Sequence, residues 1–167
     1  LVASDAAPTY VVGSLAERIA LDGGQVLTGE CIELSEGEIP FAPVVSALRH
    51  LARDLDDDEL DAIFGEASSE LIRLFPEVAR GAIPGPDSLG LGSVGQARLF
   101  EFLLGIFQRM AARAPLTVVI EDLHWADRST RDLLFFLTRS MRDEQLLLVV
   151  TYRSDELGRG HPLRSWI

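Results

Sequence analysis

Apolar residues along the chain follow two spacings, one typical of helices and one typical of buried strands. Repeats of three or four positions predict helices over residues 11–21, 43–54, 59–64, 68–75, 93–112 and 129–141. The helix that starts at Ser93 or Gly95 has the clearest pattern, because its large apolar residues recur on one face: Leu99, Phe102, Leu103, Ile106, Phe107 and Met110. This face is expected to be core rather than a cofactor site.

Two continuous apolar runs, at residues 116–120 and 146–151, predict strands buried on both faces, and residues 25–31 are also predicted to form a strand. The order strand, helices, strand, helix, strand implies right-handed crossovers, and therefore a parallel sheet. The predicted fold class is α/β, in three layers, with a parallel sheet of about three strands flanked by helices.

The connections between these elements are acidic or rich in Gly and Pro. Residues 33–40 are predicted to be an acidic loop, and residues 81–95 a flexible connection. The latter matches G-x-G-x-x-G at 90–95, but no strand precedes the match, so we interpret it as a loop. The acidic residues at 56–59 could chelate a cation, although an acidic first turn of a helix is the favoured interpretation.

Composition limits the classes of function. A chain of 167 residues fits one domain, and 47% of its residues are hydrophobic, so a packed core is expected. The net charge of −11 argues against direct binding of nucleic acid. No apolar run approaches the ~20 residues needed to span a bilayer. The single cysteine, Cys31, excludes a disulfide framework, is expected in the core and is compatible with a cytoplasmic location.

The most informative feature is the end of the strand at residues 116–120, where Glu121 and Asp122 follow. Ligands of open α/β sheets bind beyond the carboxyl ends of the strands, and carboxylates there suit Mg²⁺. This is the form of a Walker B strand. An alternative, a zinc hydrolase site of Asp122, His124 and Asp127, is disfavoured because the spacing is short and a fourth ligand is missing.

The basic residues do not supply the phosphate-binding part that a nucleotide site needs beside a Walker B strand. All 15 are Arg, and the chain contains no Lys. A phosphate loop of the form G-x-x-x-x-G-K-[ST] needs a Lys to reach the phosphates, so this motif cannot be drawn on the chain.

The run from Glu121 to Asp127 reads Glu-Asp-Leu-His-Trp-Ala-Asp, and residues 147–153 read Leu-Leu-Val-Val-Thr-Tyr-Arg. Together with residues 29–34 and 39–43, these runs resemble the STAND-class, AAA+-like P-loop ATPase domains of large ATP-binding LuxR-type transcriptional regulators. The resemblance extends over residues 9–164 approximately. It implies a P-loop NTPase-like fold, the cofactors ATP and Mg²⁺, and a switch in transcriptional signalling.

The resemblance also implies roles for matching positions. Glu121 and Asp122 resemble the catalytic and metal-binding Walker B pair, and Arg153 resembles the arginine that senses the γ-phosphate. His124 and Trp125 lie just beyond the strand, and Asp127 follows them. We expect Trp125 to pack, His124 to cap or hydrogen-bond, and Asp127 to start the next helix, while a direct role beside the nucleotide stays open.

The segment at residues 2–9 aligns with the family's phosphate loop and departs from it. Only Thr9 fits as a cofactor-binding residue. Ala7 replaces a glycine, Pro8 stands where the lysine belongs, and Asp5 brings negative charge. The strand that should precede the loop is also expected to be absent. The implied organisation is an atypical segment at 1–10, a partial ATPase core at 11–156 with the Walker B and sensor strands, and a truncated tail at 157–167.

This departure makes the chain a partial module that is not expected to be catalytically competent, with weak or absent binding of ATP and Mg²⁺. The sheet order implied by the resemblance is 5-1-4-3-2, so the strand at 146–151 is expected to be a bare edge. An alternative function is therefore a protein–protein interaction module that associates through this edge. The expected partner is the remainder of the parent regulator or another copy of the chain, with neither nucleic acid nor membrane.

Overall fold

A computed structural model describes residues 2–5, 9–33, 40–65, 93–141 and 144–165 of the chain. Within these ranges it describes all side chains except those of residues 2–5, 9–10, 93–94 and 165. The predicted helix at 68–75, most of the connection at 81–95 and most of the acidic loop at 33–40 lie outside the described residues.

The centre of the fold is a parallel sheet whose four described strands are in the order β1-β4-β3-β2. The strands are β1 (Val2–Asp5), β2 (Gln25–Glu30), β3 (Leu116–Glu121) and β4 (Leu146–Tyr152). β3 lies between β2 and β4, and every residue of it except Glu121 is buried. This position explains the continuous apolar run, because a strand covered on both faces has no polar side. The predicted α/β class, the parallel sheet and its three predicted strands are confirmed.

The strand β1 corrects two sequence-based expectations. Residues 2–5 do not belong to a loop: they form a strand that pairs in parallel with β4, from Val2 beside Val149 to Asp5 beside Tyr152. As a result, β4 is an internal strand rather than the bare edge that we expected. The segment Val-Ala-Ser-Asp has little strand propensity of its own, so its conformation follows from pairing with the apolar β4.

The described α-helices agree with the hydrophobic periodicity. They are α1 (Thr9–Leu21), α2 (Ala42–Asp54), α3 (Asp57–Phe64), α6 (Ser93–Arg113) and α7 (Arg128–Ser140). Three short 3-10 helices follow strands or close the described chain: η1 (Leu123–Trp125), η2 (Ser154–Glu156) and η3 (Pro162–Ser165). The last three residues of the G-x-G-x-x-G match lie in the first turn of α6, and its first three lie outside the described residues.

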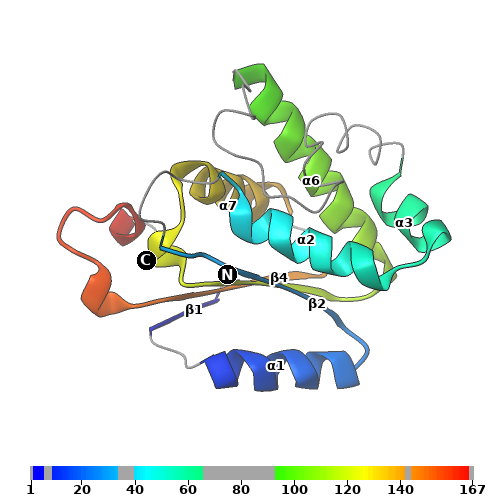
Figure 1. Cartoon of the computed structure of the whole chain (residues 1–167), viewed down its shortest axis with the longest axis horizontal. Helices are drawn as coiled ribbons and strands as arrows, with labels where there is room; N and C mark the ends of the chain where they lie inside the picture. The colour runs from blue at the N-terminus through cyan, green and yellow to red at the C-terminus, as the bar shows by residue number, and fades with distance from the viewer. Residues whose placement is uncertain (1, 6–8, 34–39, 66–92, 142–143, 166–167) are drawn as a thin grey trace.

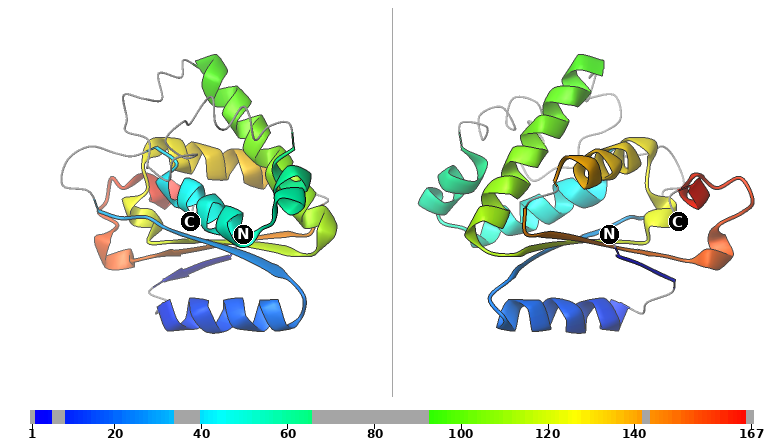
Figure 2. Two further views of the ribbon diagram at one scale, coloured as in Figure 1. Left: turned by 45° about the vertical axis from the view of Figure 1, so that its right-hand side comes forward. Right: turned by 180° about the vertical axis from the view of Figure 1, so that it is seen from behind.

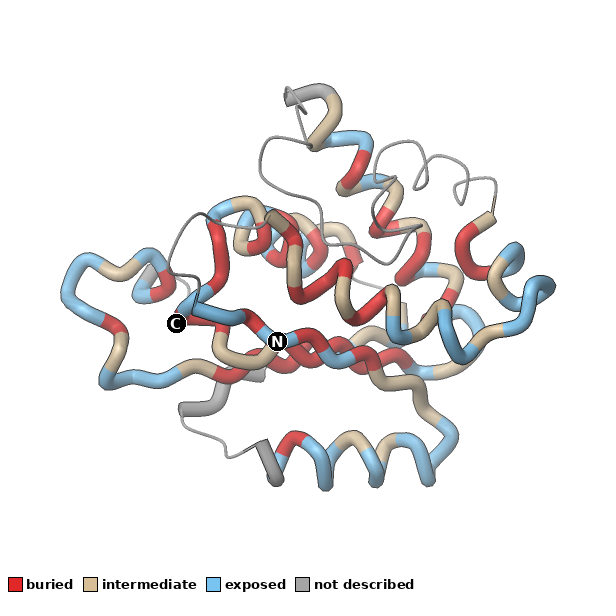
Figure 3. The backbone as a smooth tube through the Cα atoms, in the orientation of Figure 1, coloured by how far each residue is buried: buried red, intermediate tan, exposed pale blue. Residues whose placement is uncertain are grey.

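The helices divide unequally between the two faces of the sheet. Figures 1 and 2 show α1 on one face, and α2, α6 and α7 on the other, with α3 beside α6. The larger core cluster lies on the second face and includes Val118, Ile120 and Leu148 from the strands. The cluster beneath α1 is small and contains Val12, Val119 and Val149. Figure 3 shows the same asymmetry, because α1 is largely exposed whereas the helices opposite are largely buried where they meet the sheet.

Local contacts explain how the elements end and approach one another. The acidic segment at 56–59 forms a capping box: Asp56 accepts from the Glu59 N–H, and Glu59 accepts from the Asp56 N–H. This confirms the predicted acidic first turn. At Gly29, a Cβ atom would lie 2.2 Å from the Pro43 carbonyl oxygen, so only glycine lets β2 pack this closely on α2.

Within the described residues, the helices are too short or too polar to cross a bilayer.

Candidate functional site

The carboxyl edge of the sheet carries the residues that the sequence identified. Glu121 is the last residue of β3 and is partly exposed. The backbone of Asp122 turns out of the strand with φ 54° and ψ 43°, a left-handed conformation, and its N–H donates to Thr151 Oγ1 over 3.1 Å. The side chain of Asp122 is 35% exposed, so its carboxylate reaches solvent. Neighbouring carboxylates at the end of a buried strand are thus presented at the edge where α/β sheets bind ligands.

His124, two residues farther on, is buried, with its side chain 1% exposed. Its Nδ1 accepts the Arg153 N–H over 3.4 Å, and its Nε2 lies 2.9 Å from Glu156 Oε2. The ring also contacts Trp125 in a tilted arrangement, with 4.7 Å between the ring centroids and 49° between the ring planes. His124 therefore hydrogen-bonds, as expected, and Trp125 packs on it while remaining partly exposed to solvent.

Asp127 starts α7, as the sequence suggested. Its Oδ1 accepts the Thr130 N–H over 3.0 Å, and its Oδ2 accepts the Thr130 hydroxyl. The Thr130 Oγ1 in turn accepts the N–H of Phe41, which precedes α2. Asp127 is consequently a structural cap.

The zinc alternative conflicts with this geometry. Asp127 is buried and both of its oxygens are engaged by Thr130. Among the described residues, no group of three or more His, Cys, Asp and Glu side chains is arranged to hold a metal ion. Mg²⁺ does not need such a group, because it keeps several waters and binds through one or two carboxylates. Glu121 and Asp122 therefore fit Mg²⁺ and do not fit zinc.

Arg153 follows β4 at the same edge. Its guanidinium pairs with Asp155 Oδ2 at 3.0 Å and with Glu156 Oε1 at 2.5 Å, and its side chain is half exposed. The hydrogen bond from the Arg153 backbone to His124 thus places Arg153 beside the end of β3. The Arg153 guanidinium itself binds the carboxylates of Asp155 and Glu156, in its own segment. The four carboxylates named here (Glu121, Asp122, Asp155 and Glu156) outnumber this one guanidinium, so the edge favours cations over bare anions.

The start of α1 also lies at this edge. Because β1 is parallel to β4, its last residue Asp5 lies beside Tyr152, and α1 begins at Thr9. The connection consists of residues 6–8, Ala-Ala-Pro, without glycine or lysine. A phosphate loop binds through backbone N–H groups of a glycine-rich turn and through a lysine, and proline has no N–H. The residues present fit the metal-binding side of a nucleotide site and do not fit its phosphate-binding side.

Cys31, directly after β2, is buried behind this edge and donates its N–H to the Glu121 carbonyl over 2.9 Å. Burial and, to a smaller extent, the negative charges of Asp127 and Asp122 raise the pKa of its thiol to about 12. The thiol is therefore protonated at neutral pH and is a poor nucleophile, in agreement with the predicted core role.

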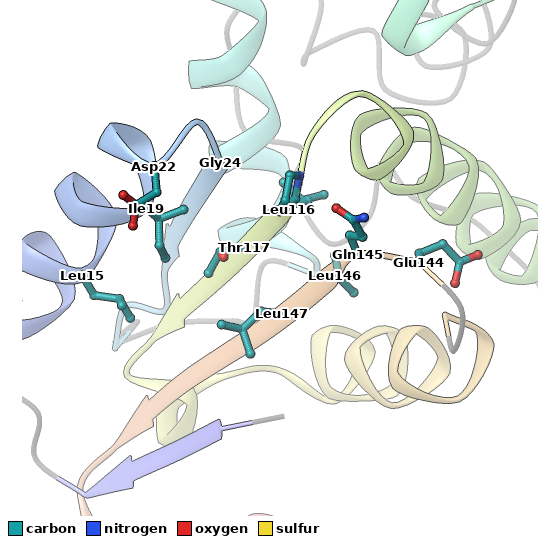
Figure 4. Close-up of a pocket in the computed structure, with 11 residues that line it drawn as sticks. Leu15, Ile19, Asp22, Gly24, Leu116, Thr117, Glu144, Gln145, Leu146 and Leu147 are labelled. Carbon is teal, nitrogen blue, oxygen red and sulfur yellow. The ribbon is translucent and has the colours of Figure 1, made fainter.

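The open pocket of about 550 Å³ shown in Figure 4 is at the other end of the sheet. It lies between the end of α1 and the amino ends of β3 and β4, and is lined by Leu15, Ile19, Leu116, Thr117 and Leu147 among others. Its lining is mostly apolar, and it is remote from Glu121 because β3 separates the two ends. The pocket is therefore not part of the candidate site.

Sequence reasoning missed two contributors to the site. Thr151 accepts the backbone N–H of Asp122. The sequence indicates this role only by placing a polar residue at the end of an apolar strand. Glu156 contacts both His124 and Arg153, and a local pattern carries no signal for this contact because His124 and Glu156 are far apart in sequence.

Comparison with protein families gives one match, to a family described as the AAA ATPase domain, over residues 9–150. The matched range includes β3 with its acidic end and most of β4, and it begins at the first residue of α1. Comparisons with curated proteins and with solved structures found no match.

Proposed function

The chain belongs to the AAA ATPase domain family, and from this membership we propose that it is the partial ATPase module of a LuxR-type, STAND-class transcriptional regulator. In the intact parent, such a module is a nucleotide-dependent switch. We further propose that this chain by itself binds Mg²⁺·ATP weakly or not at all and is not a competent ATPase. Glu121 and Asp122 are the proposed catalytic and Mg²⁺-binding residues, and Thr9 and Arg153 the proposed nucleotide contacts.

One observation supports this proposal. The acidic end of β3 lies at the same edge of the sheet as the connection between β1 and α1, and this connection lacks the residues that bind phosphates. β1 ends at Asp5 and α1 begins at Thr9, so residues 6–8 are all that the chain offers between them. The family match also begins at Thr9 and leaves this connection out. Charge-assisted hydrogen bonds contribute about 1.5–3 kcal/mol each, so losing the lysine and several backbone donors weakens binding by orders of magnitude.

Calorimetric titration with ATP in the presence of Mg²⁺ tests the proposed incompetence. The expected result for the chain is no saturable binding at micromolar nucleotide. Micromolar binding that depends on Mg²⁺ would contradict the proposal, because the residues present would then suffice as a phosphate site.

A matched gain-of-function variant tests whether the rest of the site is intact. Residues 6–8 are replaced by Gly-Xaa-Xaa-Xaa-Xaa-Gly-Lys in front of Thr9, which restores the complete motif. We expect Mg²⁺·ATP binding to appear in this variant and to be lost when the introduced lysine is replaced by Ala. Asp122→Asn in the same variant is expected to weaken the Mg²⁺ dependence. Failure of the restored loop to bind would show that Glu121 and Asp122 do not serve a nucleotide site.

The proposed partner is the remainder of the parent regulator or a second copy of the chain. The net charge of −11 supports a protein partner over nucleic acid, because phosphates repel an acidic surface.

A further inference from the structure

The buried ring of His124 links the end of β3 to the segment after β4. Its Nδ1 accepts the Arg153 N–H over 3.4 Å, and His161 Nε2 lies 3.1 Å from the His124 carbonyl oxygen. An acceptor Nδ1 corresponds to the tautomer with its proton on Nε2, and Asp122 Oδ1 lies 4.0 Å from the same Nδ1. Nε2 lies 2.9 Å from Glu156 Oε2, although the carboxylate is out of line for a hydrogen bond. The ring thus presents its polar edge to Glu156 inside the protein.

The two carboxylate oxygens of Glu156 contact different groups. Oε2 is close to the His124 ring, and Oε1 lies 2.5 Å from Arg153 Nη1. The Glu156 side chain is 30% exposed, whereas the second carboxylate on the guanidinium, Asp155, is 69% exposed. Exposed ion pairs hold side chains weakly, because forming them costs side-chain entropy and water screens the charges. Of the two carboxylates, Glu156 is the one that also contacts a buried group, the His124 ring.

We propose that Glu156 is a positioning residue for Arg153, and that buried His124 holds Glu156 in the orientation that binds the guanidinium. In the nucleotide-free chain, Arg153 is then already neutralised by its own segment. A phosphate group at the carboxyl edge of the sheet has to displace Glu156 before it can bind Arg153. This inference rests on the proposed function, since it gives Arg153 a phosphate to bind.

The arrangement itself is tested without nucleotide, by NMR of the full chain with ¹⁵N-labelled arginine and histidine. The Arg153 side-chain resonance is assigned from its loss in Arg153→Gln. Glu156→Gln is expected to shift the resonances of both Arg153 and the His124 ring, and to increase the exchange rate of the Arg153 Nε–H at least threefold. The matched variant Asp155→Asn, which also removes a carboxylate from Arg153, is expected to leave the His124 ring unchanged.

The support by His124 is tested with His124→Gln, which is expected to loosen Arg153 as Glu156→Gln does. Because His124 is buried, the fold of this variant is checked first by circular dichroism, and Glu156→Gln gives the independent answer if the fold is lost. Unchanged Arg153 and His124 resonances in Glu156→Gln would overturn the proposal. This result is separate from the fate of the proposed ATP site, because no nucleotide is present.

The competition is tested by adding Mg²⁺·ATP at millimolar concentration and following the Arg153 resonance. We expect Glu156→Gln to respond at a concentration at least threefold lower than the unmodified chain, and the response to vanish in Arg153→Gln combined with Glu156→Gln. An equal response in the two proteins, or no response in either, would overturn the idea that Glu156 competes with phosphate.

Discussion

Two aspartates, Asp122 and Asp127, have different roles near the end of β3, and the surroundings of each carboxylate determine its role. Asp127 is buried, and Thr130 engages both of its oxygens, so it can serve only as a helix cap. Asp122 is 35% exposed, and its backbone rather than its side chain is fixed by Thr151. At the residue scale, the candidate ligand is the aspartate whose carboxylate is the more exposed, with His124 Nδ1 lying 4.0 Å from its Oδ1.

Cys31 gives a prediction of pH dependence. Its pKa is about 12 in the folded chain against 9.0 ordinarily, so the unfolded state loses the proton first as pH rises. The stability due to the buried neutral thiol is complete below pH 9.0 and is lost progressively towards pH 12. By about pH 10.5 the expected loss is about 2 kcal/mol.

Urea unfolding of the chain and of Cys31→Ala, at pH 8 and at about pH 10.5, measures this loss. The variant lacks the thiol, so its stability is expected to fall less over the same interval. Parallel decreases in the two proteins would show that the thiol is not the group that titrates.

At the scale of elements, one polar network joins two helices that are far apart in the sequence. Thr130 receives the Phe41 N–H on one side and donates to Asp127 on the other. Phe41, at φ 61°, lies before α2, and Asp127 lies before α7, so the beginnings of both helices depend on the same hydroxyl. The Phe41 ring also packs edge-on against Phe100 of α6, with 6.0 Å between the ring centroids.

Asp127→Ala is therefore expected to destabilise the fold by about 2–4 kcal/mol. It removes a cap worth about 1 kcal/mol and leaves buried donors of Thr130 without an acceptor. Asp56→Ala is the matched control, because it removes an exposed cap from α3, and its expected cost is about 0.5–1 kcal/mol. Denaturant unfolding compares the two, and equal costs would mean that the buried network adds nothing to a simple cap.

Features that are encoded by their own residues could be predicted from the sequence, whereas features that depend on distant contacts could not. β3 and β4 were predicted because each is a long apolar run, and the candidate site was assigned to Glu121 and Asp122 because they end such a run. β1 was missed because its pairing with β4, and not its own residues, makes it a strand. The contact of Glu156 with His124 was missed for a similar reason, since η2 turns it back on a residue of the preceding crossover.

At the scale of the whole molecule, the sheet is covered thickly on one face and thinly on the other (Figure 2). Among the described helices, α1 covers the thinly covered face of the sheet. Leu15 of α1 and Leu147 of β4 remain exposed there. β1 protects the apolar β4 by pairing along its edge, so these four residues matter for solubility more than their length suggests.

Deletion of residues 1–5 is expected to expose the β4 edge and to cause association that increases with protein concentration, as measured by light scattering. In the deleted chain, Leu147→Lys is expected to reduce the association, because a charged residue on an exposed strand disfavours pairing with another sheet. The same substitution in the full chain is the control and is expected to change little. A deleted chain that stays monomeric at high concentration would show that β1 is dispensable as a cover.

The left-handed backbone of Asp122 has an evolutionary consequence. A residue with a Cβ atom is less stable in this conformation than glycine, although aspartate tolerates it better than most. Selection for heat resistance alone therefore favours glycine at this position and removes the carboxylate with it. Keeping an aspartate here sacrifices a little thermal tolerance for the proposed oxygen ligand, and laboratory evolution under heat is expected to replace this residue early.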